Sequence, residues 1–294
     1  EIVSVLRNGK MVSNDLLTQE VSDNELINLM MGKIQKSKIN KNNNIGDVKL
    51  DVKSVIFKDP VNNIKKLDNI NFQIKSGEIL GLAGVSGNGQ VELANIIAGI
   101  EKNFEGKIII NNNDVSNKGV KSRKKLNLSY IPENRLGVGL APGVSVLDNS
   151  IVKDYFQTKL GPHLSKNKTV KYLENLINQF SIKAPDPKAE ISTLSGGNMQ
   201  KLLMGRELVG NPDVIIASQP TRGLDVNAVE AIHNLLITQR NRGSAIFLIS
   251  EDLDELFKLS NKLLVIYEGK VIKSFSTSES DIESIGLAMA GISE

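Results

Sequence analysis

The heptapeptide Leu194-Ser195-Gly196-Gly197-Asn198-Met199-Gln200 stands at the predicted start of a helix that continues to Leu208. Ser195 is a favourable helix cap, because its hydroxyl accepts a hydrogen bond from a free N–H of the first turn. Gly196 and Gly197 leave further N–H groups uncovered at the positive end of the helix dipole. The sequence therefore predicts a helix terminus that faces a phosphate group. A capped surface helix without a ligand is the alternative.

A second glycine-rich segment begins about 110 residues earlier, after the short apolar stretch from Ile79 to Ala83. Its residues are Gly84, Val85, Ser86, Gly87, Asn88, Gly89, Gln90 and Val91. Helical periodicity continues to Ile100, so the segment is predicted to join a strand to a helix and to form a backbone cradle for an anion. A plain strand–turn–helix connection is the alternative when the segment is considered alone.

The two residues after the last glycine of this loop differ from those of a phosphate-binding loop. Such a loop has lysine and then serine or threonine, whereas this chain has Gln90 and Val91. Gln90 keeps a hydrogen-bond donor but has no charge, and Val91 has no hydroxyl for Mg²⁺. Because charged hydrogen bonds contribute about 1.5–3 kcal/mol each, we expect phosphate to bind weakly.

The apolar stretch from Val214 to Ala217 predicts a buried strand, and Ser218 and Gln219 follow it. In a nucleotide hydrolase an acidic pair at this place holds Mg²⁺ and polarises the attacking water. Neither Ser218 nor Gln219 carries a charge. Since a general base contributes about 10²–10⁴-fold to a rate, we expect turnover at this site to be very slow.

Taken together and in order, these motifs resemble the nucleotide-binding domain of ABC transporters. Three segments are similar to the second domain of the tandem ATP-binding subunits of simple-sugar and nucleoside importers: Pro132-Glu133-Asn134-Arg135, Leu194–Asn198, and Pro220-Thr221-Arg222-Gly223-Leu224-Asp225. The resemblance covers residues 50–294. It implies an α/β fold of the P-loop NTPase type, with a mainly parallel core sheet, an antiparallel β subdomain and a helical subdomain at about 145–200.

The resemblance also implies roles for particular residues. In this family two domains close head to tail around two ATP molecules, and each site combines the phosphate loop of one domain with the signature of the other. The chain departs from the active pattern at Gln90, Val91, Ser218, Gln219 and Glu251, the last at the position of a switch histidine. We therefore expect its own site to be degenerate and its signature to serve a partner site. The signature residues are Leu194, Ser195, Gly196, Gly197, Asn198 and Gln200.

Further roles follow from the same resemblance. Gly223, Leu224 and Asp225 are expected to cross a dimer interface, and Glu133 and Arg135 to lie in the loop that couples nucleotide to the membrane subunit. The implied ligand is ATP, with Mg²⁺ weak or absent at this site. The implied partners are a first nucleotide-binding domain of the same polypeptide, integral membrane permease subunits and, indirectly, a solute-binding protein. The expected location is the cytoplasmic face of the cell membrane.

The chain contains a partial repeat of itself. Each of the segments 1–32 and 267–291 has a tight X-Gly hairpin turn and then a capped helix. We interpret residues 1–32 as the tail of a preceding nucleotide-binding domain, although two unrelated hairpin–helix pairs are the alternative. Residues 33–49 are polar and rich in asparagine, which predicts a linker. The chain does not begin with Met, and with the repeat this leads us to expect a piece of a longer protein.

Composition narrows the function classes. The 294 residues are 40% hydrophobic and 23% charged, which is typical of a globular protein. A net charge of +3 gives no case for nucleic acid, and without cysteine or clustered histidine we expect no metal site in the protein itself. The rival hypotheses are a structural dimerisation module without nucleotide binding, a non-transport ABC protein, and an independently active ATPase.

Overall fold

The computed structural model describes residues 2–7, 10–17, 45–153, 159–160, 163–164, 166–277, 282–289 and 291. A six-stranded sheet forms its centre, in the order β14-β13-β5-β12-β11-β8. The strands are β5 (Ile79–Ala83), β8 (Leu128–Ile131), β11 (Val214–Ser218), β12 (Ala245–Ile249), β13 (Lys262–Tyr267) and β14 (Lys270–Ser276). All neighbours pair in parallel except β13 and β14, which form an antiparallel hairpin.

The central strands are buried on both faces, which explains their unbroken apolar sequences. Every residue of β5, β11 and β12 is buried. Alternate residues point into two separate cores: one includes Ile79, Ile215 and Ile246, and the other includes Leu80, Ile216 and Phe247.

A four-stranded antiparallel sheet covers the second core. It consists of β3 (Val48–Lys58), β4 (Lys65–Lys75), β6 (Glu105–Ile110) and β7 (Asn113–Asp114), in the order β4-β3-β6-β7. Helix α2 (Gln90–Ala98) contributes Leu93, Ile96 and Ile97 to the same core. Phe72 of β4 stacks on Phe247 of β12 with ring centroids 4.8 Å apart, so the two sheets are in direct contact.

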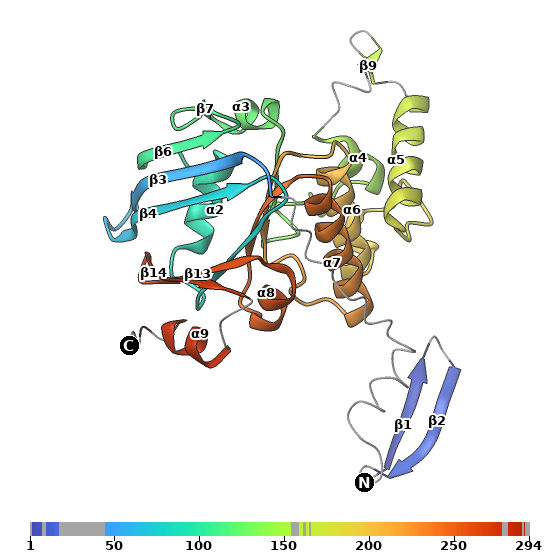
Figure 1. Cartoon of the computed structure of the whole chain (residues 1–294). Coiled ribbons are helices and arrows are strands. Elements are labelled where there is room, and N and C mark those ends of the chain that lie inside the picture. The colour runs from blue at the N-terminus through green and yellow to red at the C-terminus, as the bar shows by residue number, and fades with distance from the viewer. Residues whose placement is uncertain are drawn as a thin grey trace.

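Helices pack against the first core, and most of them lie on the side of the molecule away from the antiparallel sheet (Figure 1). They are α4 (Val146–Ile151), α5 (Lys166–Phe180), α6 (Gly196–Leu208), α7 (Val226–Asn241), α8 (Leu253–Leu259) and α9 (Ile282–Met289). Shorter elements are α3 (Val120–Lys125), a 3₁₀ turn at Ile191–Thr193, β9 (Lys159–Leu160) and β10 (His163–Leu164). None of the described helices has the length and apolar character that a membrane-spanning segment needs.

The predicted fold class is confirmed, as are the strands at 79–83, 107–110, 214–217 and 245–249 and the helices at 90–100 and 226–241. The two hairpins are also present, as β1 (Ile2–Arg7) with β2 (Lys10–Leu17) and as β13 with β14. The helix predicted after the first hairpin lies outside the described residues, and so does most of the predicted linker. The ordered sheet begins slightly before residue 50, since β3 starts at Val48 and Gly46 N donates to Ser76 O.

Candidate functional site

The glycine-rich loop connects β5 to the start of α2, and two of its glycines are sterically required. Gly89 has φ +103°, and a Cβ there would lie 2.6 Å from the carbonyl oxygen of Lys66. At Gly84 a Cβ would lie 2.8 Å from the carbonyl oxygen of Ile266. Val85, Ser86 and Gly87 form the exposed rim of the loop. At these glycines no side chain covers the backbone, and such a loop suits an anion bound at a helix N-terminus.

Two side chains of this loop donate hydrogen bonds to its own backbone. Gln90 is only 6% exposed, and its Nε2 donates to the carbonyl oxygen of Val85 at 3.0 Å. Asn88 Nδ2 donates to the same oxygen at 3.1 Å. Val91 is 46% exposed and offers no oxygen at the next helical position. The side-chain amides of Gln90 and Asn88 therefore find a hydrogen-bond acceptor within the loop itself, without a ligand.

Asn88 also fastens the loop to the turn between β13 and β14. Its Oδ1 accepts from Glu268 N at 2.8 Å, and its carbonyl oxygen accepts from Gly269 N at 3.2 Å. Gly269 in turn accepts at its carbonyl from Asp68 N at 2.8 Å. One short turn thus connects the loop to the antiparallel sheet.

The end of β11 carries no acidic residue. Ser218 is 1% exposed, and Gln219 has a left-handed φ of +48°. Gln219 N donates to Ile249 O at 2.8 Å, and its Oε1 accepts from Glu251 N at 3.3 Å. Gln219 is therefore joined to the segment after β12 that carries Glu251.

A cleft of about 510 Å³ lies beside these residues. It is lined by Val91, Asn95, Tyr130, Glu133, Ser218 and Arg222, among others. The carboxylate of Glu133 forms an ion pair with the guanidinium of Arg222. Burial raises the pKa of the Tyr130 hydroxyl to about 12, and the negative charge of Glu133 adds to this shift. The Tyr130 hydroxyl remains protonated and donates to Asn95 Oδ1 at 3.2 Å.

Mg²⁺ prefers carboxylate and other oxygen ligands in an octahedral arrangement, and among the residues that line this cleft Glu133 supplies the carboxylate. The Glu133 carboxylate is paired with Arg222, and the Gln219 oxygen is engaged by the Glu251 backbone. Within the part of the chain that the structure describes, no three His, Cys, Asp or Glu residues are grouped as a metal would need. The glycine cradle, by contrast, fits the phosphates of a nucleotide.

The signature heptapeptide begins α6. Ser195 caps the helix, and its Oγ accepts from Asn198 N at 3.4 Å and from Asn198 Nδ2 at 2.9 Å. The Oδ1 of Asn198 accepts from Lys183 N at 2.8 Å, which holds the cap against the preceding chain. Leu194, Gly196 and Gly197 remain partly exposed. The free N–H groups of this helix end are therefore accessible.

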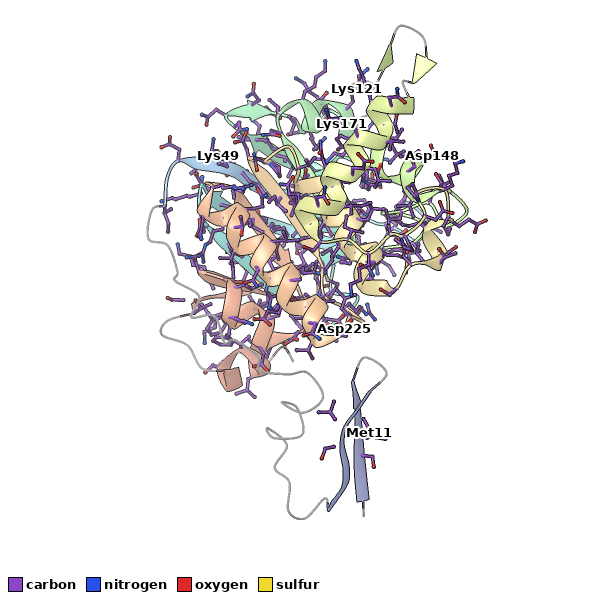
Figure 2. The ribbon with its side chains drawn as sticks, turned by 90° about the vertical axis from the view of Figure 1, so that its right-hand side faces the viewer. Met11, Lys49, Lys121, Asp148, Lys171 and Asp225 are labelled. Atoms are coloured by element: carbon purple, nitrogen blue, oxygen red, sulfur yellow. The ribbon has the colours of Figure 1, made fainter. Side chains whose placement is uncertain are left out.

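Helix α7 begins beside the signature. Its cap is Asp225, whose Oδ1 accepts from Ala228 N at 3.0 Å, and Figure 2 shows Asp225 at the end of the helix. A Cβ at Gly197 would lie 3.1 Å from the Cβ of Ala228, so a glycine allows the two helix ends to approach closely. Gly223 has φ +69° and precedes Leu224, which packs against the first core.

Several contacts around the site join segments far apart in the chain, and the sequence interpretation did not find them. Arg135 Nε donates to Gln200 Oε1 at 2.7 Å, and Arg135 Nη2 donates to the carbonyl oxygen of Arg222 at 3.0 Å. Glu255 Oε1 accepts from Thr221 Oγ1 at 2.8 Å and lies 2.9 Å from His233 Nε2, and this group is buried. Only the charges of Glu133, Arg135 and Arg222 were visible in the sequence, and their pairing was not.

The fold and the order of the motifs define an ATP-binding cassette. The chain belongs to the ABC transporter family, whose sequence model matches residues 67–222. A solved nucleotide-free ATP-binding cassette from an ABC transporter aligns with a TM-score of 0.68 at 20% identity, over 84% of this chain and all of that one. A dimeric cassette solved with ADP and Pi aligns with a TM-score of 0.66 at 23% identity, over 78% and 98%.

Curated relatives are importer components. A glucose import ATP-binding protein of Haloferax volcanii is 35% identical over 98% of this chain and 53% of its own length. A guanosine import ATP-binding protein of Bacillus subtilis is 36% identical over 98% of this chain and 57% of its own length. The chain thus spans little more than half the length of these relatives.

Proposed function

We propose that this chain is the degenerate, C-terminal cassette of an importer for nucleosides or simple sugars, and that it donates its signature to a competent ATP site on a first cassette of the same polypeptide. The observation that carries the proposal is the contrast between two helix ends. The N-terminus of α6 is capped and accessible, whereas the N-terminus of α2 lies behind a loop that Gln90 closes. The importer relatives and the share of their length that the chain covers support this assignment.

In this proposal the signature binds the γ-phosphate of ATP held by the partner cassette. Gly196 and Gly197 offer free backbone N–H groups at the positive end of the α6 dipole. Loop 223–225 crosses the interface between the two cassettes. Ser195 and Gln200 keep the helix end in place, the first as a cap and the second through Arg135.

The chain's own site then binds nucleotide weakly and without turnover. Gln90 supplies no charge, Glu251 would place a negative charge near the terminal phosphate, and no free carboxylate of the cleft stands ready for Mg²⁺. When bound, ATP would occupy the Gly84–Gly89 cradle as a structural ligand.

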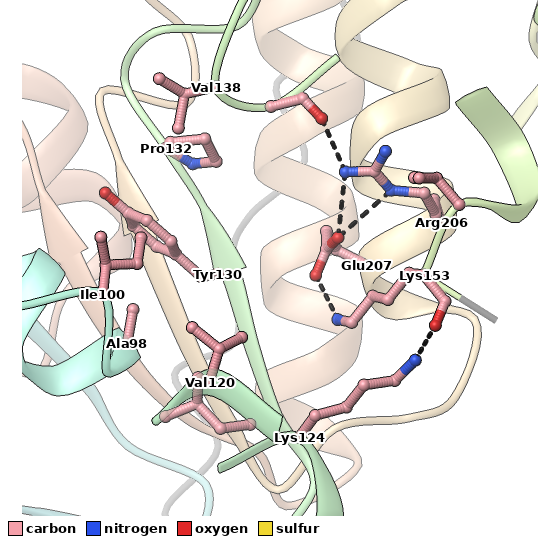
Figure 3. Close-up of a pocket in the computed structure, with 13 residues that line it drawn as sticks. Ala98, Ile100, Val120, Lys124, Tyr130, Pro132, Val138, Lys153, Arg206 and Glu207 are labelled. Atoms are coloured by element: carbon pink, nitrogen blue, oxygen red, sulfur yellow. Dashed lines mark hydrogen bonds and ion pairs between the residues drawn. The ribbon is translucent and has the colours of Figure 1, made fainter. Parts of the chain in front are cut away.

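A groove next to the cleft suits the permease (Figure 3). Four of its side chains are exposed although they are large and apolar: Ile100 at 50%, Val120 at 52%, Val138 at 58% and Val152 at 59%. The floor is an ion-paired group in which Glu207 contacts both Lys153 and Arg206. Exposed apolar side chains that gather in one place mark interaction surfaces. We assign this groove to integral membrane permease subunits at the cytoplasmic face of the membrane, with a solute-binding protein acting through them.

The second candidate function is a structural dimerisation module that never binds nucleotide. The specific observation in its favour is the Val85 carbonyl, which already accepts from both Gln90 and Asn88. Calorimetry of the chain with Mg-ATP separates the two. Measurable binding without hydrolysis supports the first function, and no binding up to millimolar ATP supports the second.

Signature donation is tested by a matched pair of variants in the complete ATP-binding subunit. Ser195 and Ser274 are both exposed serines, one in the signature and one in β14, outside the loop and the cleft. We expect Ser195→Arg to lower ATP hydrolysis at least about tenfold, because it blocks the phosphate-facing helix end. Ser274→Arg should leave the rate within about twofold, because surface substitutions away from the signature and the cleft have small effects. Equal effects of the two variants would overturn the proposal.

A further inference from the structure

Positive charge gathers around helix α3. The segment 115–132 contains the cations Lys118, Lys121, Arg123, Lys124 and Lys125 and has no acidic residue. These five cations exceed the net charge of +3 of the whole chain, so the rest of the chain is negative on balance. A charge of one sign that is concentrated in one place attracts partners of the opposite sign.

The exposed lysines of this region lack carboxylate partners. Elsewhere on the surface, Lys65 pairs with Asp68 at 3.1 Å. Lys121, Lys125 and Lys171 are all exposed, yet within the described part of the chain no ion pair includes any of them. Lys121 and Lys125 are four residues apart in α3 and therefore lie on the same side of that helix.

Helices α3 and α5 lie at the same end of the molecule. Figure 1 shows both in its upper part, with the β13–β14 hairpin below, and Figure 2 labels Lys121 and Lys171 near that upper end. The two helices also line one cavity of about 370 Å³, to which α3 contributes Lys124 and α5 contributes Tyr172. Lys121, Lys125 and Lys171 thus surround this cavity, and we call them the basic face.

The cavity itself has more cations than carboxylates. Its lining includes Lys124, Lys153 and Arg206 and one carboxylate, that of Glu207. Glu207 pairs with both Lys153 and Arg206, and Arg206 is only 7% exposed. The ammonium group of Lys124 donates to the carbonyl oxygen of Lys153. A phosphate group in this partly enclosed place would therefore face an excess of positive charge.

The cavity adjoins the groove that we assign to the permease. The same four charged residues, Lys124, Lys153, Arg206 and Glu207, line both. A permease spans the bilayer, so a surface next to its docking groove is a surface that approaches the lipid headgroups. The basic face is such a surface.

We propose that the basic face binds the headgroups of anionic phospholipids and that the cavity receives a headgroup phosphate. The inference rests on the proposed function, because the permease groove is what turns this face toward the membrane. Lysines close to an anionic bilayer are attracted to it, and the attraction falls off within a Debye length. The face would thus hold the cassette against the membrane beside the permease.

The test is sedimentation of the chain with phospholipid vesicles, without nucleotide or permease. Vesicles of equal parts phosphatidylcholine and phosphatidylglycerol should bind the chain at least about tenfold more strongly than vesicles of phosphatidylcholine alone. Added salt should remove the difference. Lys121→Glu with Lys125→Glu should lower binding to the anionic vesicles at least about tenfold, and Lys124→Gln, which removes one cation from the cavity, about fivefold.

A matched control reverses two exposed lysines elsewhere. Lys75 and Lys262 line a different surface, and Lys262 begins β13, four strands from β8 in the central sheet. Lys75→Glu with Lys262→Glu changes the net charge equally and should alter vesicle binding by less than about twofold. If the reversals in α3 lower the melting temperature, Lys121→Gln with Lys125→Gln gives the comparison without new negative charge.

Three outcomes would overturn the proposal. They are equal losses in the two double reversals, no preference for phosphatidylglycerol, and a Lys124→Gln variant that binds as the unchanged chain does. The same assay separates other sources of phosphate. Soluble glycerol phosphate and an RNA duplex, each at the phosphate concentration of the vesicles, should bind more weakly than the anionic vesicles. Tighter binding of either would replace the lipid with a free phosphate compound or with nucleic acid.

The failure of the basic face and the failure of the proposed function are distinguishable, because vesicle binding needs neither ATP nor the signature. If the anionic vesicles do not bind while Ser195→Arg lowers hydrolysis, only the basic face is wrong. If the vesicles bind but Ser195→Arg has no effect, the proposed signature donation is wrong and the basic face stands.

Discussion

Gln90 donates from its side-chain amide to the carbonyl oxygen of Val85 at 3.0 Å, and this bond closes the glycine-rich loop on itself. The contact replaces a bond that a phosphate would otherwise make with the side chain at this position. The loop therefore keeps its shape through internal contacts, and its affinity for phosphate is open to direct manipulation.

Gln90→Lys is expected to strengthen ATP binding about tenfold to a hundredfold, because a charged donor adds about 1.5–3 kcal/mol. Without nucleotide the melting temperature should fall, since the new ammonium is buried beside Gly84 and unpaired. Calorimetry and thermal melting of the same samples measure both effects. Gln90→Met is the neutral control, and a gain in affinity for that variant would contradict the electrostatic explanation.

Removal of Mg²⁺ should leave ATP affinity within about twofold, because the cleft offers no free carboxylate of the kind that Mg²⁺ prefers. The Glu133 carboxylate is paired with Arg222, and the Gln219 side-chain oxygen accepts from the backbone N–H of Glu251. The measurement is ATP titration of the chain in Mg²⁺ and in EDTA at equal ionic strength. Tenfold tighter binding in Mg²⁺ would show that Glu133 or Glu251 becomes a ligand.

Asn88→Ala should release the turn between β13 and β14 from the loop. The variant loses the bonds to Val85 O and from Glu268 N, and unfolding should become easier by about 1 kcal/mol. Hydrogen exchange at the Glu268 amide should accelerate. Asn103→Ala, at an exposed site remote from the loop, is the control and should change neither quantity.

Glu255→Ala should lower the free energy of unfolding by about 3 kcal/mol, because Thr221 and His233 lose their shared buried acceptor. Asp254→Ala, at an exposed neighbouring position in the same helix turn, should cost less than about 0.5 kcal/mol. Chemical denaturation of the two variants gives the comparison. Similar losses would mean that the effect comes from helix α8 itself and not from the buried group.

Much of the fold was predictable because its signals are local. The strands β5, β11 and β12 are short apolar runs, which sheets covered on both faces require. The Ser195 and Asp225 caps are likewise visible as residue types at the starts of periodic segments.

The connections between segments were not predictable in the same way. Arg135 and Gln200 are 65 residues apart, and Arg222 and Glu133 are 89 apart. No periodicity links such positions, because their pairing depends on how α6 and loop 221–225 pack against the end of β8. The packing of α8 buries His233 against Glu255, and no local pattern in the helix at 226–241 indicates this contact.

The doubly occupied Val85 carbonyl has an evolutionary consequence. Groups that act together in catalysis contribute little when restored one at a time. A reversion of Gln90 to lysine alone would remove the hydrogen bond that closes the loop. Val91, Ser218, Gln219 and Glu251 would still supply neither a ligand for the metal nor a general base. Under the proposed function, each single step back toward an active site would thus lose stability before it gained any rate, and the loss of chemistry would act as a ratchet.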